Sequence, residues 1–129
     1  LLFIPFFEYI NWAKTRFRIQ IMHITQVSQD FSVSPQITAA DVTEIANAGF
    51  KSIICNRPDF EEPRQPVFND IANAAHDVGL KTAHVPITAM PMPAQIQEMA
   101  NAISELPKPI FAYCRSGNRS SILFHAANA

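Results

Sequence analysis

The chain has 129 residues, of which 48% are hydrophobic and 16% charged, and its formal net charge at pH 7 is −1. This length and composition predict one globular domain with a packed core, and they exclude a disordered chain. No basic stripe appears in the sequence, so we expect no nucleic-acid partner. Two cysteines are too few for a disulfide framework, which favours a reducing, cytoplasmic location.

The first 21 residues differ from the rest of the chain. Residues 1–7 are strongly apolar apart from Pro5, but Glu8 and three basic residues follow. The run is too short to span a membrane, and its charges are in the wrong order for a signal peptide. We therefore expect residues 1–21 to be an N-terminal extension outside the domain, without membrane binding. The domain itself is expected over 22–129, and a truncated C-terminus is left open.

From Gln29 onward, short β-like runs alternate with helical patterns. Strands are expected at 31–34, 52–55, 82–85 and 109–113, and helices near Thr38, Pro66, Ile96 and Ser120. This alternation predicts an α/β fold with a mostly parallel central sheet and helices on both faces. Ligands bind beyond the carboxyl ends of the strands in such sheets. Cys114, residues 57–59 and the proline-rich loop at 88–93 are therefore expected around one pocket.

The segment after the last strand carries the strongest functional pattern. The apolar run 109–113 ends at Cys114, a short polar loop follows, and a helix can begin at Ser120. Such a loop directs backbone N–H groups and the positive helix end at one point, which stabilises a thiolate. Arg119 can bind an oxyanion through two parallel hydrogen bonds. This order of residues predicts an enzyme with a nucleophilic cysteine. The alternative is a buried cysteine before a surface turn.

The length of this loop bears on the chemistry. Cysteine phosphatases place five residues between the cysteine and the arginine, whereas four residues separate Cys114 from Arg119. The six residues 114–119 resemble the active loop of rhodanese-type sulfurtransferases, in which the cysteine carries a persulfide. A tighter ring of N–H donors suits a terminal sulfur better than a phosphoryl group. The loop therefore favours sulfur transfer.

Several stretches, taken together, resemble the beta-lactamase-hydrolase-like, phosphatase-like domain family. They are residues 31–38, 48–50, 56–59 with 61–63, 84–87 and 112–120, in the family's order. The resemblance runs from about Met22 to the C-terminus. It implies a fold like that of the dual-specificity phosphatases, with Cys114 as nucleophile and Arg119 as anion clamp. Some members are fused to a metallo-hydrolase-like domain, so a metallo-hydrolase-like partner protein is left open.

The chain departs from working cysteine phosphatases at the general acid. Those enzymes place an aspartate in the loop after the third main strand, where it protonates the leaving oxygen. Residues 88–92 hold no carboxylate. Asp59 is the stand-in that we expect, with Glu61 or Glu62 as alternatives, although all three also fit a solvated acidic turn. Sulfur transfer needs no such acid.

The remaining residues of the loop have expected roles in binding. Arg115, Ser116, Gly117 and Asn118 are expected to contact the substrate, although Arg115 also fits an ordinary surface arginine. We expect the Ser120 hydroxyl to donate to the Cys114 thiolate.

Away from the loop, Cys55 fits a buried structural cysteine better than a redox partner of Cys114. The four histidines lack metal-ligand spacing, so no metal and no cofactor are expected.

Three hypotheses follow from the sequence. The leading one is a sulfurtransferase that takes sulfur from thiosulfate or a persulfide onto Cys114 and passes it to a thiol acceptor. The first alternative is a cysteine-dependent phosphatase that hydrolyses a phosphomonoester through phospho-Cys114. The second alternative is a non-catalytic module that senses oxyanions or redox state through Cys114 and Cys55.

Overall fold

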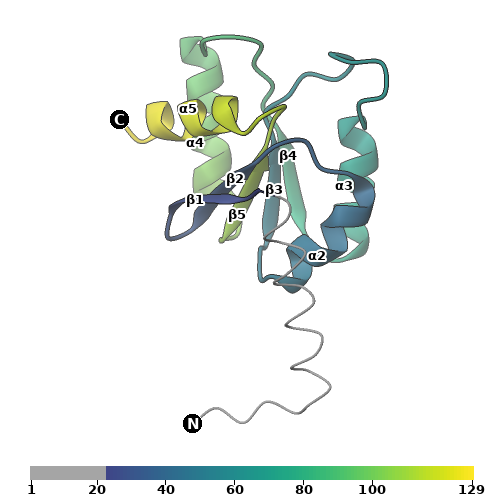
Figure 1. The fold of residues 1–129 in the computed structure, drawn as a ribbon. Helices are drawn as coiled ribbons and strands as arrows, with labels where there is room; N and C mark the ends of the chain where they lie inside the picture. Colours follow the sequence, from purple (N-terminus) through teal and green to yellow (C-terminus); the bar gives the residue numbers. More distant parts are fainter. Residues whose placement is uncertain (1–22) are drawn as a thin grey trace, which may run out of the picture.

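A five-stranded sheet forms the centre of the protein, seen in a computed structural model that describes residues 23–129 (Figure 1). The expected extension at 1–21 lies outside the described residues. The strands are β1 (Thr25–Ser28), β2 (Phe31–Ser34), β3 (Ser52–Cys55), β4 (Lys81–His84) and β5 (Ile110–Tyr113). Their order across the sheet is β1-β2-β5-β3-β4. The pairs β2–β5, β5–β3 and β3–β4 are parallel, and β1 pairs antiparallel with β2. The expected mostly parallel sheet is confirmed.

Helices cover both faces of this sheet, as the alternating pattern predicts (Figure 1). A 3₁₀ turn, η1 (Ala39–Asp41), leads into α2 (Val42–Asn47), and α3 (Phe68–Asp77) packs beside it. On the opposite face, α4 (Pro93–Glu105) packs against α5 (Asn118–Ala127). None of the helices within residues 23–129 is long and apolar enough to cross a bilayer.

Strand β5 shows why the sheet needs both layers. Phe111 and Tyr113 join one apolar cluster with side chains of α2 and α3. Ile110 and Ala112, which point the opposite way, join a second cluster with side chains of α4 and α5. All four are buried because successive side chains of a strand alternate between the two faces. The near-continuous apolar run in the sequence is the signature of this arrangement.

Two helix starts differ from the positions that the sequence predicts. Helix α3 begins at Phe68 rather than Pro66, because the Asp59 carboxylate accepts the Phe68 N–H at 2.9 Å. Helix α5 begins at Asn118, two residues before Ser120, because Gly117 in the left-handed conformation ends the loop there.

The carboxyl ends of four parallel strands lie level with one another. Tyr113 of β5 pairs with Ser34 of β2 on one side and with Cys55 of β3 on the other. Cys55 also pairs with His84 of β4. The loops that leave these strands therefore meet at one edge of the sheet. This edge carries the site described next.

Candidate active site

Cys114 lies directly after β5, at the centre of the loop edge. Its side chain is fully buried, and its backbone N–H donates to Ser34 O at 3.3 Å. The Cys114 Sγ accepts a hydrogen bond from the Gly117 N–H at 3.1 Å. The expected donation of a loop N–H to this sulfur is therefore present.

Gly117 makes this contact in a conformation that suits glycine. Its φ of +94° lies in the left-handed region, which L side chains rarely adopt. An added Cβ would lie 3.4 Å from the backbone carbon of Ser34, so the loop packs closely on the end of β2. The backbone at Gly117 thus serves two purposes: it directs an N–H at the sulfur and starts α5.

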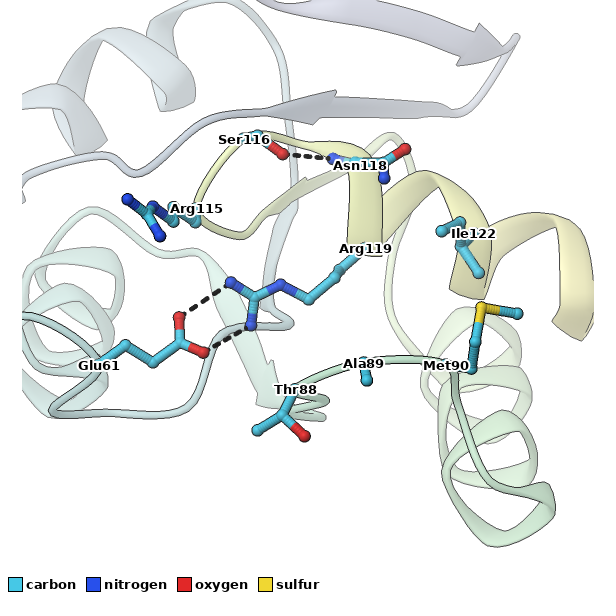
Figure 2. Close-up of a pocket in the computed structure, with 9 residues that line it drawn as sticks. All are labelled: Glu61, Thr88, Ala89, Met90, Arg115, Ser116, Asn118, Arg119 and Ile122. Carbon is cyan, nitrogen blue, oxygen red and sulfur yellow. Dashed lines mark hydrogen bonds and ion pairs between the residues drawn. The ribbon is translucent and has the colours of Figure 1, made fainter.

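Arg119, in the first turn of α5, forms a two-pronged ion pair with Glu61 (Figure 2). Its Nη1 donates to Glu61 Oε2 and its Nη2 to Glu61 Oε1, both at 2.9 Å. Nη1 also donates to Ile87 O at 2.7 Å, which fixes the guanidinium against the loop after β4. The hydrogen bonds from Arg119, and secondarily from Arg57, lower the pKa of Glu61 to about 2 against the opposing effect of burial. The same pairing raises the pKa of Arg119.

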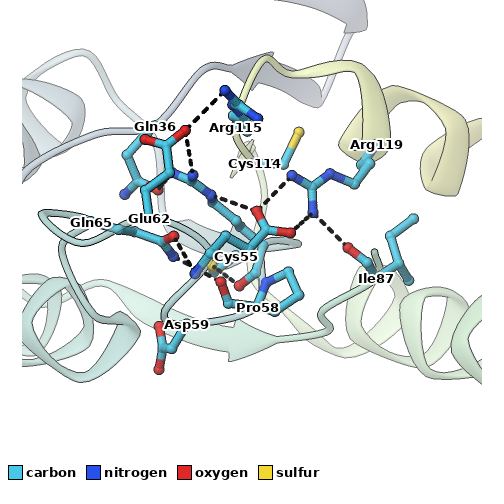
Figure 3. Close-up of polar contacts among 12 residues, drawn as sticks. Gln36, Cys55, Pro58, Asp59, Glu62, Gln65, Ile87, Cys114, Arg115 and Arg119 are labelled. Carbon is cyan, nitrogen blue, oxygen red and sulfur yellow. Dashed lines mark hydrogen bonds and ion pairs between the residues drawn. The ribbon is translucent and has the colours of Figure 1, made fainter. Parts of the chain in front are cut away.

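A second arginine, Arg57, also binds the Glu61 carboxylate, and it follows the end of β3. Only 2% of Arg57 is exposed, yet it is charged. Its Nε donates to Glu61 Oε1 at 2.8 Å and its Nη1 to Gln36 Oε1 at 2.9 Å, among the polar contacts drawn in Figure 3. Glu61 Oε1 therefore accepts hydrogen bonds from two guanidinium groups. The sequence placed residues 57–59 at the pocket but did not reveal this convergence.

A pocket of about 650 Å³ is lined by both members of the ion pair between Glu61 and Arg119, and Figure 2 shows its lining residues. Its lining combines the cysteine loop with the loop after β4 and the segment after β3, as the topology predicts. The lining residues are Glu61, Thr88, Ala89, Met90, Arg115, Ser116, Asn118, Arg119 and Ile122. Four of the expected site residues are in this set. Gly117 and Cys114 are buried and are not in this set.

Two of the expected site residues lie elsewhere or make other contacts. The Ser120 hydroxyl is buried and makes no hydrogen bond to any described residue, so the expected bond to Cys114 is not formed. Ser120 sits inside the first turn of α5 rather than at its cap. Asp59 is not part of the pocket lining: its carboxylate binds the first N–H of α3, and Figure 3 shows the side chain directed away from Cys114 and Arg119. Glu61 is the carboxylate that the structure brings to the pocket.

Arg115 and Cys55 have surroundings that fit their simpler interpretations. The Arg115 side chain is 68% exposed, and its Nη2 lies 3.0 Å from Glu62 Oε1. The buried Cys55 Sγ donates to Arg57 O at 3.3 Å, and burial raises the pKa of the Cys55 thiol. Both cysteines are free thiols. Among residues 23–129, no group of three or more side chains has the arrangement of a metal site.

Comparisons with known proteins agree with this geometry. Residues 23–129 match the model of the family described as "Beta-lactamase hydrolase-like protein, phosphatase-like domain". A beta-lactamase hydrolase-like protein from Agrobacterium fabrum is 31% identical over 104 residues, which cover 80% of this chain. These residues make up only 24% of that relative, so the chain spans about a quarter of its length.

Solved structures place the fold among the cysteine phosphatases. A candidate phosphatase from Neisseria meningitidis is 38% identical, with a TM-score of 0.71, and the match covers 77% of this chain and 71% of that one. A kinase-associated phosphatase, solved with its catalytic-site cysteine changed to serine, shares the fold at 18% identity and a TM-score of 0.64, over 84% of this chain and 76% of that one. The fold is that of the dual-specificity phosphatases, and the chain belongs to the beta-lactamase hydrolase-like, phosphatase-like domain family.

Proposed function

We propose that the domain is a cysteine-dependent phosphatase that acts on small phosphomonoesters, with Cys114 as the nucleophile. The observation that carries this proposal is the placement of Cys114 and Arg119 in one loop, with a backbone N–H on the sulfur, within a phosphatase-like family. The 38% identity to the candidate phosphatase from Neisseria meningitidis supports the same activity. The comparisons thus favour the phosphatase alternative over sulfur transfer, which was the leading expectation from the sequence.

In the proposed reaction the Cys114 thiolate attacks phosphorus, the P–O bond to the leaving group breaks, and phospho-Cys114 forms. Water then attacks phosphorus, the P–S bond breaks, and inorganic phosphate and the thiolate are released. Arg119 and the loop N–H groups stabilise the charge on the phosphoryl oxygens in both steps. Arg115, Ser116 and Asn118 line the space in which the rest of the substrate would lie.

The carboxylates near the site are poorly suited to protonating the leaving oxygen. Glu61 is held ionised by two arginines, and Asp59 is bound to the start of α3. A phosphatase built in this way should turn over aryl phosphates, whose leaving oxygen is a weak base, much faster than alkyl phosphates. The stand-in role expected for Asp59 stays a prediction, and the isosteric Asp59→Asn variant tests it below.

Sulfur transfer is the second candidate, and the absence of a free proton donor among these carboxylates favours it. In this reaction the Cys114 thiolate attacks the outer sulfur of thiosulfate, the S–S bond breaks, and sulfite leaves without needing a proton. A thiol or cyanide then removes the outer sulfur of the persulfide and regenerates the thiolate. The short loop, with four residues between Cys114 and Arg119, supports the same candidate.

Parallel assays separate the two candidates. Wild type, Cys114→Ser and a variant with one glycine inserted after Asn118 are assayed with an aryl phosphate and with thiosulfate plus cyanide. The proposal predicts aryl-phosphate turnover that exceeds sulfur transfer and disappears in Cys114→Ser. Sulfur transfer far above phosphatase activity, falling when the glycine widens the loop, would support the second candidate instead. Turnover that is indifferent to Cys114→Ser would contradict both.

A metallo-hydrolase-like partner protein remains a prediction from the family resemblance. The non-catalytic hypothesis predicts a disulfide between Cys55 and Cys114 on oxidation. Thiol titration with and without an oxidant tests it, because two thiols that react independently would count against such a switch.

A further inference from the structure

The anion-binding end of the site is already occupied by a side chain of the protein. Glu61 Oε1 accepts from Arg57 Nε at 2.8 Å and from Arg119 Nη2 at 2.9 Å, while Oε2 accepts from Arg119 Nη1 at 2.9 Å. Arg119 therefore already forms, with Glu61, the forked contact that it would form with two oxygens of a phosphoryl or sulfonyl group. In this arrangement a substrate can still reach the edge of the guanidinium that carries Nε, but it can reach the Nη1–Nη2 fork only if Glu61 leaves it.

The backbone around Glu61 is built to direct this carboxylate inward. Phe60, the residue before it, has a φ of +66°, in the left-handed region that disfavours an aromatic residue, and it is 83% exposed. Gln65 braces the segment: its Oε1 accepts the Glu61 N–H at 3.2 Å, and its Nε2 donates to Pro58 O at 2.8 Å. A strained residue held in this way next to a pocket indicates a constraint imposed by the site.

Arg57 needs an anion where Glu61 now lies. Apart from Glu61, its guanidinium has the neutral amide oxygen of Gln36 as a hydrogen-bond acceptor, while its buried Nη2 lies 3.5 Å from Glu62 Oε1 without making a hydrogen bond. Without Glu61, this buried guanidinium would keep only the ion pair with Glu62, which makes no hydrogen bond, and such an arrangement is costly. If Glu61 moved away, both Arg57 Nε and Arg119 Nη2 would face the position of one oxygen. This position would attract another anion.

We propose that Glu61 is an internal substrate mimic, and that Arg57 joins Arg119 in binding an oxyanion of the substrate once Glu61 leaves. This inference rests on the proposed function and makes it more specific. Two guanidinium groups match a tetrahedral group with two negative charges, a chemistry shared by a phosphomonoester and thiosulfate. Glu61 then lowers the affinity of this two-arginine position, because an anion that binds both guanidinium groups must compete with a tethered carboxylate.

The test measures binding without turnover, in protein carrying Cys114→Ser. Titration calorimetry measures the affinity for inorganic phosphate in this protein and in the same protein that also carries Glu61→Gln or Glu62→Gln. The last variant is the control for loss of charge, because Glu62 pairs with the exposed Arg115 and lies 3.5 Å from Arg57 Nη2, but forms no ion pair with Arg119. Glu61→Gln is expected to bind phosphate at least about tenfold more tightly, which corresponds to about 1.4 kcal/mol. Glu62→Gln is expected to change the affinity by less than about twofold.

The role of Arg57 is tested through the NMR signal of its own side-chain Nε–H group. In ¹⁵N spectra of the protein carrying both Cys114→Ser and Glu61→Gln, phosphate is expected to shift the Nε–H signals of both Arg57 and Arg119. Thiosulfate in place of phosphate is expected to shift the same two signals, whereas chloride at equal ionic strength leaves them unchanged. Adding Arg57→Lys should remove most of the gained affinity, because lysine cannot form the same fork of donors. The spectra keep the proposal testable if this last variant does not fold.

Two outcomes would overturn the inference. Phosphate affinity in Glu61→Gln that is no higher than in Glu62→Gln would show that Glu61 does not compete for the site. A phosphate-induced shift confined to Arg119 would show that Arg57 is only a structural partner of Glu61. Neither outcome depends on catalysis, so a failure here is distinct from a failure of the proposed enzyme activity, which is judged on protein that retains Cys114.

Discussion

The backbone at Gly117 offers a sharp test of whether the loop activates Cys114. Replacing Gly117 with alanine places a Cβ on a residue with a φ of +94°, which costs about 1–2 kcal/mol for an L residue in the left-handed region. The new Cβ would also lie 3.4 Å from the Ser34 backbone, a normal contact that adds little. The conformational strain therefore dominates the expected loss of stability. At this size of domain, the loss lowers the melting temperature by about 4 °C or more.

Relieving the strain should also move the Gly117 N–H away from Cys114 Sγ, which it now reaches at 3.1 Å. A hydrogen bond to a charged group contributes about 1.5 kcal/mol, which corresponds to about tenfold in reactivity if the bond is lost completely. We therefore expect Gly117→Ala to alkylate at Cys114 up to about tenfold more slowly at neutral pH. Iodoacetamide labelling followed by peptide mass spectrometry measures this rate separately from that of Cys55.

Gly79→Ala is the matched control for this variant. Gly79 has a φ of +83° with nothing within 4 Å of an added Cβ, and it follows α3 outside the described pocket. It should lose a similar amount of stability while its Cys114 alkylation rate stays at the wild-type value. Equal alkylation rates in Gly117→Ala, Gly79→Ala and wild type would refute the idea that this loop geometry activates the sulfur.

Four further predictions concern the carboxylates and the second cysteine. Asp59→Ala is expected to destabilise the protein by about 1 kcal/mol in chemical denaturation, because α3 loses the acceptor for its first N–H. Asp59→Asn should leave the ratio of aryl-phosphate to alkyl-phosphate turnover unchanged, and a selective loss of the alkyl substrate would restore Asp59 as the general acid. The pKa of Glu61 is lowered from 4.5 to about 2 in the folded state, so its ionised form stabilises the fold above pH 4.5 and loses this effect as the pH falls towards 2. The gap in melting temperature between wild type and Glu61→Gln should accordingly narrow over that range, and a constant gap would contradict the pairing. Cys55, whose thiol has a raised pKa and donates to Arg57 O, should resist alkylation until the protein unfolds in urea, and fast labelling of native Cys55 would contradict its structural role.

The sheet and the cysteine loop could be predicted because their signals are local. Residues 109–113 form an unbroken apolar run that ends on a cysteine, and a strand buried on both faces requires such a run. The first strand, Thr25–Ser28, escaped prediction because it is short, partly exposed and polar. It lies at the edge of the sheet, where neither face has to be apolar.

The partners within the site could not be predicted because they depend on tertiary contacts. Asp59 and Glu61 are equivalent in the sequence as members of an acidic turn, but Phe60 between them has a positive φ. The structure sends one carboxylate to α3 and the other to the two arginines. Ser120 was expected to be a helix cap, but the left-handed Gly117 starts the helix earlier and buries the Ser120 hydroxyl within the first turn.

A covalent intermediate on Cys114 is the most direct test of the central claim. Wild type is mixed with an aryl phosphate, quenched within milliseconds under conditions that preserve phosphocysteine, and digested for mass spectrometry. The account predicts a phosphoryl group on the peptide that contains Cys114, formed as fast as the aryl alcohol is released and absent from Cys114→Ser. Steady turnover by wild type with the phosphoryl group on another residue, or with the same rate in Cys114→Ser, would contradict it.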